Sequence, residues 1–274
     1  MSVTITNLNG IEIVQGDDAT LADLNWDVVL VAALAHVTPE GLLAEKHEDV
    51  YHCFGHLDRW AAIDIDDGQA EALRCDPELP KVLDHISQLK RANGLRMEIH
   101  NAKTVISSSS PWDTVKQFVY FPNYMELARM EYTGANLCPG DRVVFLGSGP
   151  MPLTLVCLCV QYKIYSIGIE LFSEYAQLSR KLITALGLEK QVKIIEGSHF
   201  SLPLSEPCRL IMVGADALPK DKIFAHLSKH LDQGTALSYR IYEKGLRRLL
   251  GCPVKLQTAP GNQRSDPDQA PTSR

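Results

Sequence analysis

The chain has 274 residues, of which 45% are hydrophobic and 22% are charged, a balance typical of a globular protein with a full core. Its 33 acidic residues exceed its 27 basic residues, which gives a net charge of −6. No run of Lys or Arg is dense enough to neutralise a phosphate backbone, so nucleic acid is not an expected partner.

Cysteine usage and the lack of long apolar segments indicate the compartment. The 7 cysteines include no CxxC pair, and their odd number argues against a disulfide framework and for a reducing cytoplasm. Cys157 and Cys159 lack His or Cys partners at metal-ligand spacing, so we expect them in the core and predict no metal site. No secretory leader pattern is present, and no stretch approaches the roughly 20 apolar residues that span a bilayer. We therefore expect a cytoplasmic protein without a membrane partner.

The first half of the sequence has the periodicity of helices, because its apolar residues recur at helical spacing. Thr38 before Pro39 predicts a helix start, and longer helices are expected over residues 81–103 and 122–135. We predict an all-helical domain over residues 1–136.

A different pattern begins at the turn over residues 137–141, after which short β-branched runs alternate with amphipathic helices. This alternation predicts an α/β domain with a parallel, doubly wound sheet of the Rossmann type over residues 137–259. The polar, Pro-rich residues 260–274 are expected to form a disordered tail. The predicted strands cover residues 142–146, 163–169, 191–195, 209–213 and 235–239, and the helices cover residues 153–161, 173–186 and 220–231.

A glycine motif marks the candidate ligand site of this domain. Gly147-Ser148-Gly149-Pro150 follows Leu146 at the end of the first strand and precedes a helix. Glycines allow a sharp turn and a close approach of a ligand to the backbone, although the same motif also suits a tight packing turn. Glu170 ends the next strand, about 20 residues further on, where a carboxylate can accept hydrogen bonds from both ribose hydroxyls. Together they predict a nucleoside ligand.

The residues that follow the glycine motif distinguish between two nucleoside ligands, a dinucleotide and S-adenosylmethionine. A dinucleotide loop uses a third glycine, which Met151 and Pro152 replace here. A sulfonium donor has no phosphates to bind, so we predict S-adenosylmethionine. Ser198 and His199, after the third strand, lie where an adenine edge would be recognised, and the alternative for His199 is a surface loop.

The loop after the fourth strand is a second candidate for the same ligand. Gly214, Ala215 and Asp216 stand at the carboxyl edge of the predicted sheet, where ligands bind in open α/β folds. Asp216 is suited to the α-amino group of the ligand. Its alternative role is an N-cap for the helix that begins near Pro219.

Three sequence patterns resemble those of a known family. Residues 146–154, LGSGPMPLT, are similar to the LGSGPLPLT stretch of nicotianamine synthases. Residues 120–132, YFPNYMELARMEY, resemble their YYxNYxxLxxxEY segment, and Tyr239-Arg240 with Gly245-Leu246-Arg247 resembles their closing R…G segment. The likeness covers roughly residues 90 to 250 with the motifs in the same order.

The chain most resembles the bacterial branch of this family, which makes opine metallophores of the staphylopine and pseudopaline types for metal uptake. The resemblance implies that S-adenosylmethionine is a co-substrate, without a metal. It would transfer its 3-amino-3-carboxypropyl (aminobutyrate) group to the amino group of histidine and leave methylthioadenosine. We favour L-histidine over D-histidine. The resemblance also implies a downstream opine dehydrogenase and is compatible with a homodimer.

The resemblance further implies roles for individual residues. Glu98 matches the catalytic glutamate, and a general base is required because the attacking amine must lose its proton. Tyr120, with Asn123 and Tyr124, would hold the transferred arm or the acceptor, and Tyr120 would also take part in catalysis. Arg240 would bind a carboxylate in a bidentate manner. The alternatives are a solvated helix residue for Glu98, an amphipathic helix face for the tyrosines and a strand-end surface charge for Arg240.

Three other functions remain compatible with the sequence. A nicotianamine synthase proper would need no histidine and would consume several donor molecules. A small-molecule methyltransferase would use the same fold, since a fold alone does not determine function. A protein that senses S-adenosylmethionine would bind it without turnover.

Overall fold

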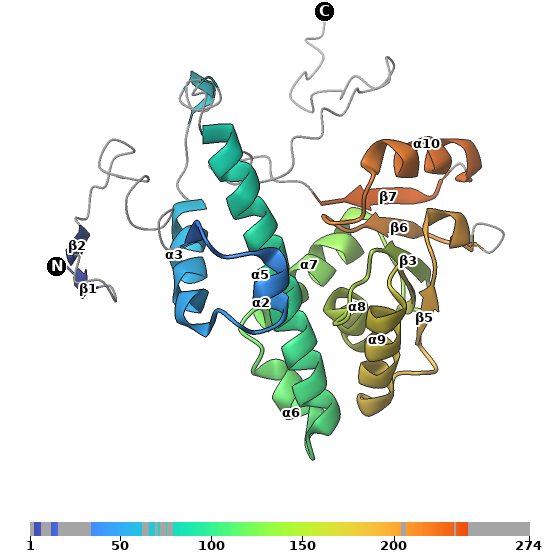
Figure 1. Cartoon of the computed structure of the whole chain (residues 1–274). Helices are drawn as coiled ribbons and strands as arrows, with labels where there is room; N and C mark the ends of the chain where they lie inside the picture. The colour runs from blue at the N-terminus through green and yellow to red at the C-terminus, as the bar shows by residue number, and fades with distance from the viewer. Residues whose placement is uncertain are drawn as a thin grey trace, which may run out of the picture.

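The computed structural model is shown in Figure 1. It describes residues 3–6, 12–15, 34–61, 66–68, 71, 75, 79–203, 207–232 and 234–240. The helix expected from the apolar residues before Leu34 lies outside the described residues, as do the predicted tail over residues 260–274 and the family-like segment at residues 245–247.

The N-terminal segment contains strands that the sequence pattern did not reveal. Strands β1 (Val3–Thr6) and β2 (Glu12–Gln15) pair in an antiparallel two-stranded sheet. Both are rich in β-branched residues, which favour strands. The N-terminal half is therefore not all-helical, because each strand is too short for the two-residue period to stand out in the sequence.

Short helices follow. Helix α2 (Pro39–Leu43) begins as predicted, since Thr38 Oγ1 accepts a hydrogen bond from the Gly41 amide at 3.0 Å. The 3₁₀ helix η2 (Glu48–Val50) leads directly into α3 (Tyr51–Ala61). These elements pack on the N-terminal part of α5 (Leu79–Ser107) through a small core of Leu34, Val37, Leu42, Val50, Cys53, Phe54, Leu57, Ile86, Leu89 and Ala92.

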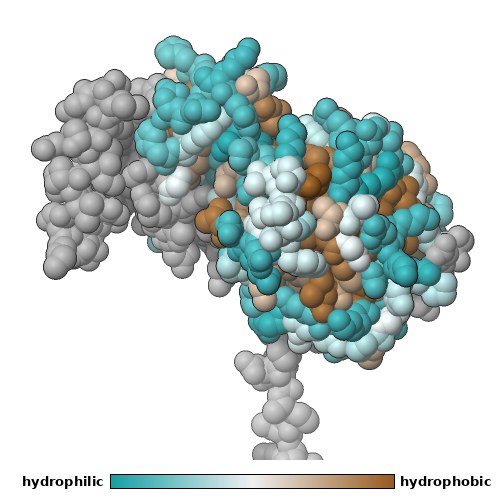
Figure 2. Space-filling model, turned by 90° about the horizontal axis from the view of Figure 1, so that it is seen from below, coloured by the Kyte–Doolittle hydropathy of each residue, from teal (hydrophilic) through white to brown (hydrophobic). Residues whose placement is uncertain are grey.

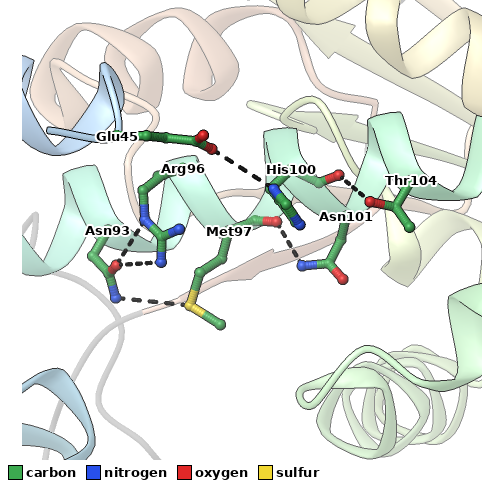
Figure 3. A network of polar contacts seen from close by, with 7 residues as sticks. All are labelled: Glu45, Asn93, Arg96, Met97, His100, Asn101 and Thr104. Carbon is green, nitrogen blue, oxygen red and sulfur yellow. Dashed lines mark hydrogen bonds and ion pairs between the residues drawn. The ribbon is translucent and has the colours of Figure 1, made fainter. Parts of the chain in front are cut away.

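Helix α5 is the longest element, with 29 residues, or about 44 Å at 1.5 Å per residue. Figure 1 shows it between the short N-terminal helices and the sheet. One side carries the polar network of Figure 3, in which Arg96 donates to Asn93 and His100 lies 3.7 Å from Glu45. Glu98 is two residues from both Arg96 and His100, so it points about 160° away from them, toward the sheet.

The C-terminal half contains a five-stranded, fully parallel sheet in the order β5-β4-β3-β6-β7. Each strand lies within about two residues of its predicted position at both ends, which confirms the Rossmann-like α/β fold. The strands are β3 (Arg142–Leu146), β4 (Tyr165–Glu170), β5 (Val192–Glu196), β6 (Leu210–Val213) and β7 (Ala236–Tyr239).

Helices cover both faces of the sheet. Helices α8 (Leu153–Tyr162) and α9 (Ser173–Ala185) share one apolar cluster with alternate residues of β3, β5 and β6. Helix α10 (Lys220–His230) packs on the opposite face against the other set of alternate residues. This two-sided burial explains why the central strands β3 and β6 are almost entirely apolar.

The cluster beneath α8 and α9 continues into the helical half. It includes Ala102 of α5, Val115 of α6 (Pro111–Lys116) and Ala128 of α7 (Phe121–Gly134). The apolar core therefore crosses the domain boundary predicted at residue 136. The division at that residue stays a prediction about the chain's organisation.

Gly168, in the middle of β4, has no room for a side chain. An added Cβ would lie 2.7 Å from Ser148 Oγ and 2.8 Å from Ile194 Cδ1. Because both neighbours are packed, we expect Gly168→Ala to lower the free energy of unfolding by about 1–3 kcal/mol, measured by denaturant titration. The matched control is Gly55→Ala in α3, where nothing lies within 4 Å and a helix gains about 0.5–1 kcal/mol. Equal effects of the two changes would contradict this account.

Candidate functional site

The site forms where the strand order reverses. The chain runs from β3 outward to β4 and β5, then returns to place β6 on the other side of β3. The loops after β3 and β6 therefore stand side by side at the carboxyl edge, where open α/β sheets bind ligands. They contain Gly147–Pro150 and Gly214–Asp216, which are predicted site segments. The Gly214 amide donates to the Leu146 carbonyl at 2.9 Å and ties the two loops together.

The glycine loop needs its glycines. Gly147 and Gly149 have φ of +76° and +72°, values that side-chain-bearing residues rarely adopt. Leu146 faces the core on the α10 side, so only its main chain is available to a ligand, and Pro150 is also buried. Ser148 is 5% exposed, and its hydroxyl has no hydrogen-bond partner within the described structure. A buried hydroxyl of this kind is suited to a polar ligand atom.

Glu170 lies at the end of β4 as predicted, and it also fixes the glycine loop, a role that the sequence did not suggest. Its carboxylate accepts hydrogen bonds from the amides of Gly149 and Phe172, both at 3.0 Å, and the side chain is buried. Each oxygen keeps a second lone pair, so the carboxylate can still accept hydroxyl groups of a ribose.

Glu98 reaches this loop from α5. Its Oε1 accepts a hydrogen bond of 2.7 Å from the Tyr124 hydroxyl of α7. Its Oε2 lies against Gly149, where an added Cβ would come within 2.9 Å. The structure thus brings Glu98 and Tyr124, which the family resemblance singled out, together with the glycine loop. Glu98 is therefore not a solvated helix residue.

Burial controls the ionisation of this pair. It raises the pKa of Glu98 from 4.5 to about 7, against the hydrogen bond from Tyr124, which favours the carboxylate. Asp216 and Glu170 also raise this pKa, whereas Arg240 lowers it. Burial and the adjacent Glu98 raise the pKa of Tyr124 well above 10, so the phenol remains a hydrogen-bond donor. The carboxyl group is therefore able to gain and lose a proton near neutral pH.

Arg240 approaches the same group of residues from the end of β7. Its guanidinium donates to Thr154 Oγ1 at 2.8 Å and lies 5.0 Å from the Phe145 ring centroid. It is half-buried, so it is not a strand-end surface charge. Tyr120 is also half-buried, with its ring edge-on to Phe118, whereas Asn123 is exposed on the first turn of α7.

The loop after β6 is held by a lysine that the sequence analysis did not single out. Lys220 is buried and donates to the carbonyls of Gly214, Ala215 and Ala217. Asp216 keeps contact with solvent, yet surrounding protein atoms raise its pKa, against Arg91 and Lys220, which lower it. The N-cap of α10 is Pro219, so Asp216 does not have that alternative role.

Lys220 did carry a signal in the sequence. A cation in the first turn of a helix is opposed by the helix dipole, so a lysine directly after Pro219 indicates some other partner. Thr154, fully buried on α8, was also missed, because a threonine inside an apolar helix resembles ordinary packing.

Ser198 and His199 lie after β5 as expected. Ser198 Oγ accepts from the Phe200 amide at 3.3 Å, within its own 3₁₀ turn, η3 (His199–Ser201). The His199 ring lies 5.5 Å from the His226 ring of α10. Their contact with an adenine therefore stays a prediction, and so does the surface alternative for His199.

A separate apolar hollow lies elsewhere on the molecule. Figure 2 shows apolar patches between hydrophilic ones on the face seen from below. A cavity of about 360 Å³ is lined by Trp112, Lys116, Phe121, Met125, Val156, Cys157, Val160 and Gln161, and it includes none of the predicted site residues. Its lining contains no carboxylate that could act as a proton acceptor in the way that Glu98 could.

The described residues contain no group of three or more His, Cys, Asp or Glu side chains arranged to hold a metal ion. None of their helices is both long and apolar enough to cross a bilayer.

The sheet order, the glycine turn and the acidic end of β4 define a Rossmann-like protein whose sheet edge suits a nucleoside ligand. A family model described as nicotianamine synthase protein matches residues 44–264, and the chain belongs to this family.

Named relatives agree with this assignment. An L-histidine 2-aminobutanoyltransferase of Yersinia pestis is 26% identical over 181 residues, which is 66% of this chain and 65% of that protein. Nicotianamine synthase 1 of Hordeum vulgare is 26% identical over 183 residues, or 62% of this chain and 56% of that protein. The chain thus spans less than two thirds of the length of these two relatives.

Solved structures extend the similarity over more of the chain. MtNAS in complex with MTA and tNA has a TM-score of 0.73 at 29% identity, covering 85% of this chain and 86% of that one. A glutamate-to-glutamine variant of MtNAS in complex with S-adenosylmethionine has a TM-score of 0.71 at 29% identity, covering 79% and 85%.

The raised pKa of Glu98 implies a cost to folding at high pH. The folded state favours the protonated carboxyl, so stability falls as pH rises from 4.5 to about 7. Glu98→Gln keeps the acceptor for Tyr124 but cannot ionise. We expect it to raise the free energy of unfolding by about 1–3 kcal/mol at pH 8 and to have little effect at pH 4, measured by urea titration.

Glu126→Gln is the matched control, because Arg129 lowers the pKa of the exposed Glu126. This variant should show no gain at pH 8. A Glu98→Gln protein that is no more stable than the wild type at pH 8 would contradict the buried position of the carboxyl group.

Proposed function

We propose that this protein transfers the 3-amino-3-carboxypropyl group of S-adenosylmethionine to the amino group of histidine. The observation that carries the proposal is the Glu98 carboxyl, hydrogen-bonded to Tyr124 at 2.7 Å, in contact with Gly149 of the glycine loop. Membership of the nicotianamine synthase family and the histidine-specific name of the Yersinia pestis relative support it.

The cleft has the groups that the donor requires. Glu170 would accept the ribose hydroxyls, and the buried Ser148 hydroxyl would meet another polar atom of the nucleoside. Asp216, at the carboxyl edge, would attract the cationic end of the donor, since a sulfonium and an ammonium are both positively charged. The S-adenosylmethionine complex of the MtNAS variant supports the choice of this donor.

The reaction requires one proton acceptor. The acceptor nitrogen forms a bond to the γ-carbon of the donor while the bond between that carbon and sulfur breaks, and the sulfur leaves as the neutral thioether methylthioadenosine. The nitrogen must give up a proton, and Glu98 would take it as general base. A pKa near 7 allows this carboxyl to be ionised before the step and protonated after it.

Neighbouring side chains would orient the reactants. The Tyr124 hydroxyl fixes the Glu98 carboxylate through its hydrogen bond. Arg240 would bind a carboxylate of the donor or the acceptor, since its guanidinium lies near enough to Glu98 and Tyr124 to lower both pKa values. Tyr120 and Asn123 would contact the substrate at the start of α7.

The setting of the reaction is part of the same proposal. We expect a cytoplasmic, metal-independent enzyme of opine metallophore biosynthesis, with L-histidine as acceptor, a downstream opine dehydrogenase and a homodimeric assembly. The second candidate is a nicotianamine synthase proper, which the similarity to MtNAS and to the Hordeum vulgare protein favours.

Product analysis tests the reaction class. Incubation with S-adenosylmethionine and L-histidine should release methylthioadenosine and one aminobutyrylated histidine, identified by mass spectrometry. S-adenosylhomocysteine would instead show methyl transfer. Methylthioadenosine formed at the same rate without histidine would identify a nicotianamine synthase. Faster product formation from D-histidine than from L-histidine would reverse the preferred enantiomer. Binding of S-adenosylmethionine without any product would identify a sensor.

Glu98→Gln tests the base. Turnover should fall about 100-fold or more because the proton acceptor is lost, whereas the dissociation constant for S-adenosylmethionine should change little. The comparison is Glu126→Gln, an exposed glutamate on α7, which should leave turnover unchanged. Near-normal turnover by Glu98→Gln would remove Glu98 from this role.

The pH dependence gives an independent check. Only the ionised carboxylate can accept a proton, so kcat/KM should rise with pH and level off above the pKa of about 7. Initial rates between pH 5.5 and 8.5 would show this limb. If the residual activity of Glu98→Gln rises over the same pH range, the rise belongs to another titrating group and not to Glu98.

A further inference from the structure

Lys220 stands in an unusual environment for a lysine. It begins α10, is 5% exposed and donates hydrogen bonds to the carbonyls of Gly214, Ala215 and Ala217, the last two at 2.9 Å. An ammonium has three protons to donate, and these three carbonyls match that number. One side chain therefore fixes most of the loop that follows β6.

This loop is packed directly on the glycine loop. A Cβ added to Gly147 would lie 3.0 Å from the Cβ of Ala217, and one added to Gly214 would lie 2.9 Å from the Gly147 carbonyl oxygen. Gly214 also donates to the Leu146 carbonyl at 2.9 Å. A shift of the β6 loop by a few tenths of an ångström would therefore move Gly147 as well.

The position of Lys220 has an energetic cost. Burial of an ammonium is unfavourable, and the dipole of α10 opposes a cation in its first turn. An apolar residue would fill the same space without either penalty. The hydrogen bonds to three carbonyls offset that cost only while the β6 loop keeps its present conformation, so the lysine favours that conformation over others.

The charge of Lys220 also acts on the site. Together with Arg91, it lowers the pKa of Asp216 against the effect of burial. The Asp216 carboxylate in turn contributes to the raised pKa of Glu98. Removal of the cation would thus change the protonation of groups in the cleft as well as the backbone.

We propose that Lys220 is a positioning residue, which holds the Gly214–Ala217 loop against the Gly147 turn and thereby sets the affinity of the cleft for S-adenosylmethionine. The proposal rests on the proposed function for the identity of the ligand. It does not depend on which group of that ligand is transferred.

The test compares Lys220→Met with Lys222→Met, a change of the same kind at an exposed lysine of the same helix. Calorimetry should show at least a tenfold higher dissociation constant for S-adenosylmethionine in Lys220→Met and a change below twofold in Lys222→Met. At saturating donor, kcat should stay within threefold while the KM for the donor rises tenfold. Circular dichroism should show that both variants are folded.

A Lys220→Met protein that melts at a lower temperature but binds the donor within twofold of wild type would overturn the proposal, since Lys220 would then serve stability alone. If that variant does not fold, Lys220→Gln replaces it under the same criterion, because its shorter neutral amide cannot reach all three carbonyls.

A failure of the Lys220 proposal can be distinguished from a failure of the proposed transfer reaction. A wild-type protein that binds the donor but releases no methylthioadenosine would refute the transfer and leave the role of Lys220 intact. If the wild type does not bind the donor, hydrogen exchange decides. Faster exchange at residues 147–149 and 214–217 in the folded lysine variant supports the coupling of the two loops, and unchanged exchange refutes it.

Discussion

The Glu98 carboxyl group, which accepts a hydrogen bond from Tyr124 and lies against Gly149, joins the helical half to the sheet at the point where the chemistry would take place. Glu98 comes from α5, Tyr124 from α7, and the carboxylate rests on Gly149 at the edge of the sheet. Burial makes its ionisation costly, so the surrounding elements must keep it in place. The positive φ of Gly149 and the absence of a side chain there are what allow the approach.

Other elements place the parts of this arrangement. Glu170 and Ile169, at the end of β4, bind the amides of Gly149 and Gly147, which fixes the glycine loop. Lys220, at the start of α10, fixes the neighbouring loop that follows β6. The glycine loop and the β6 loop are therefore held by backbone hydrogen bonds and buried side chains, whereas the first turn of α7 includes exposed residues such as Asn123.

Much of the fold was predictable from the sequence, because the central strands β3 and β6 are short apolar runs and glycine or proline separates many of the strands from the helices. Sequence order alone placed Gly147, Glu170 and Asp216 at one edge of a parallel sheet. Glu98 could not be found this way: a glutamate in a long helix has no local mark, and only the family resemblance singled it out. The partners of Lys220 could not be predicted, because they are main-chain carbonyls, and only its place in the first turn of a helix marked it as unusual. The strands β1 and β2 were missed because four residues show too little alternation.

The apolar cluster that runs from α5, α6 and α7 into the underside of β3 limits how new specificity could evolve here. A different N-terminal half could not be recombined with this sheet without uncovering side chains such as Phe145. Divergence in the choice of acceptor should therefore accumulate through single replacements on the cleft-facing sides of α5 and α7. Exchange of whole modules, which is common among proteins with separable domains, would be selected against.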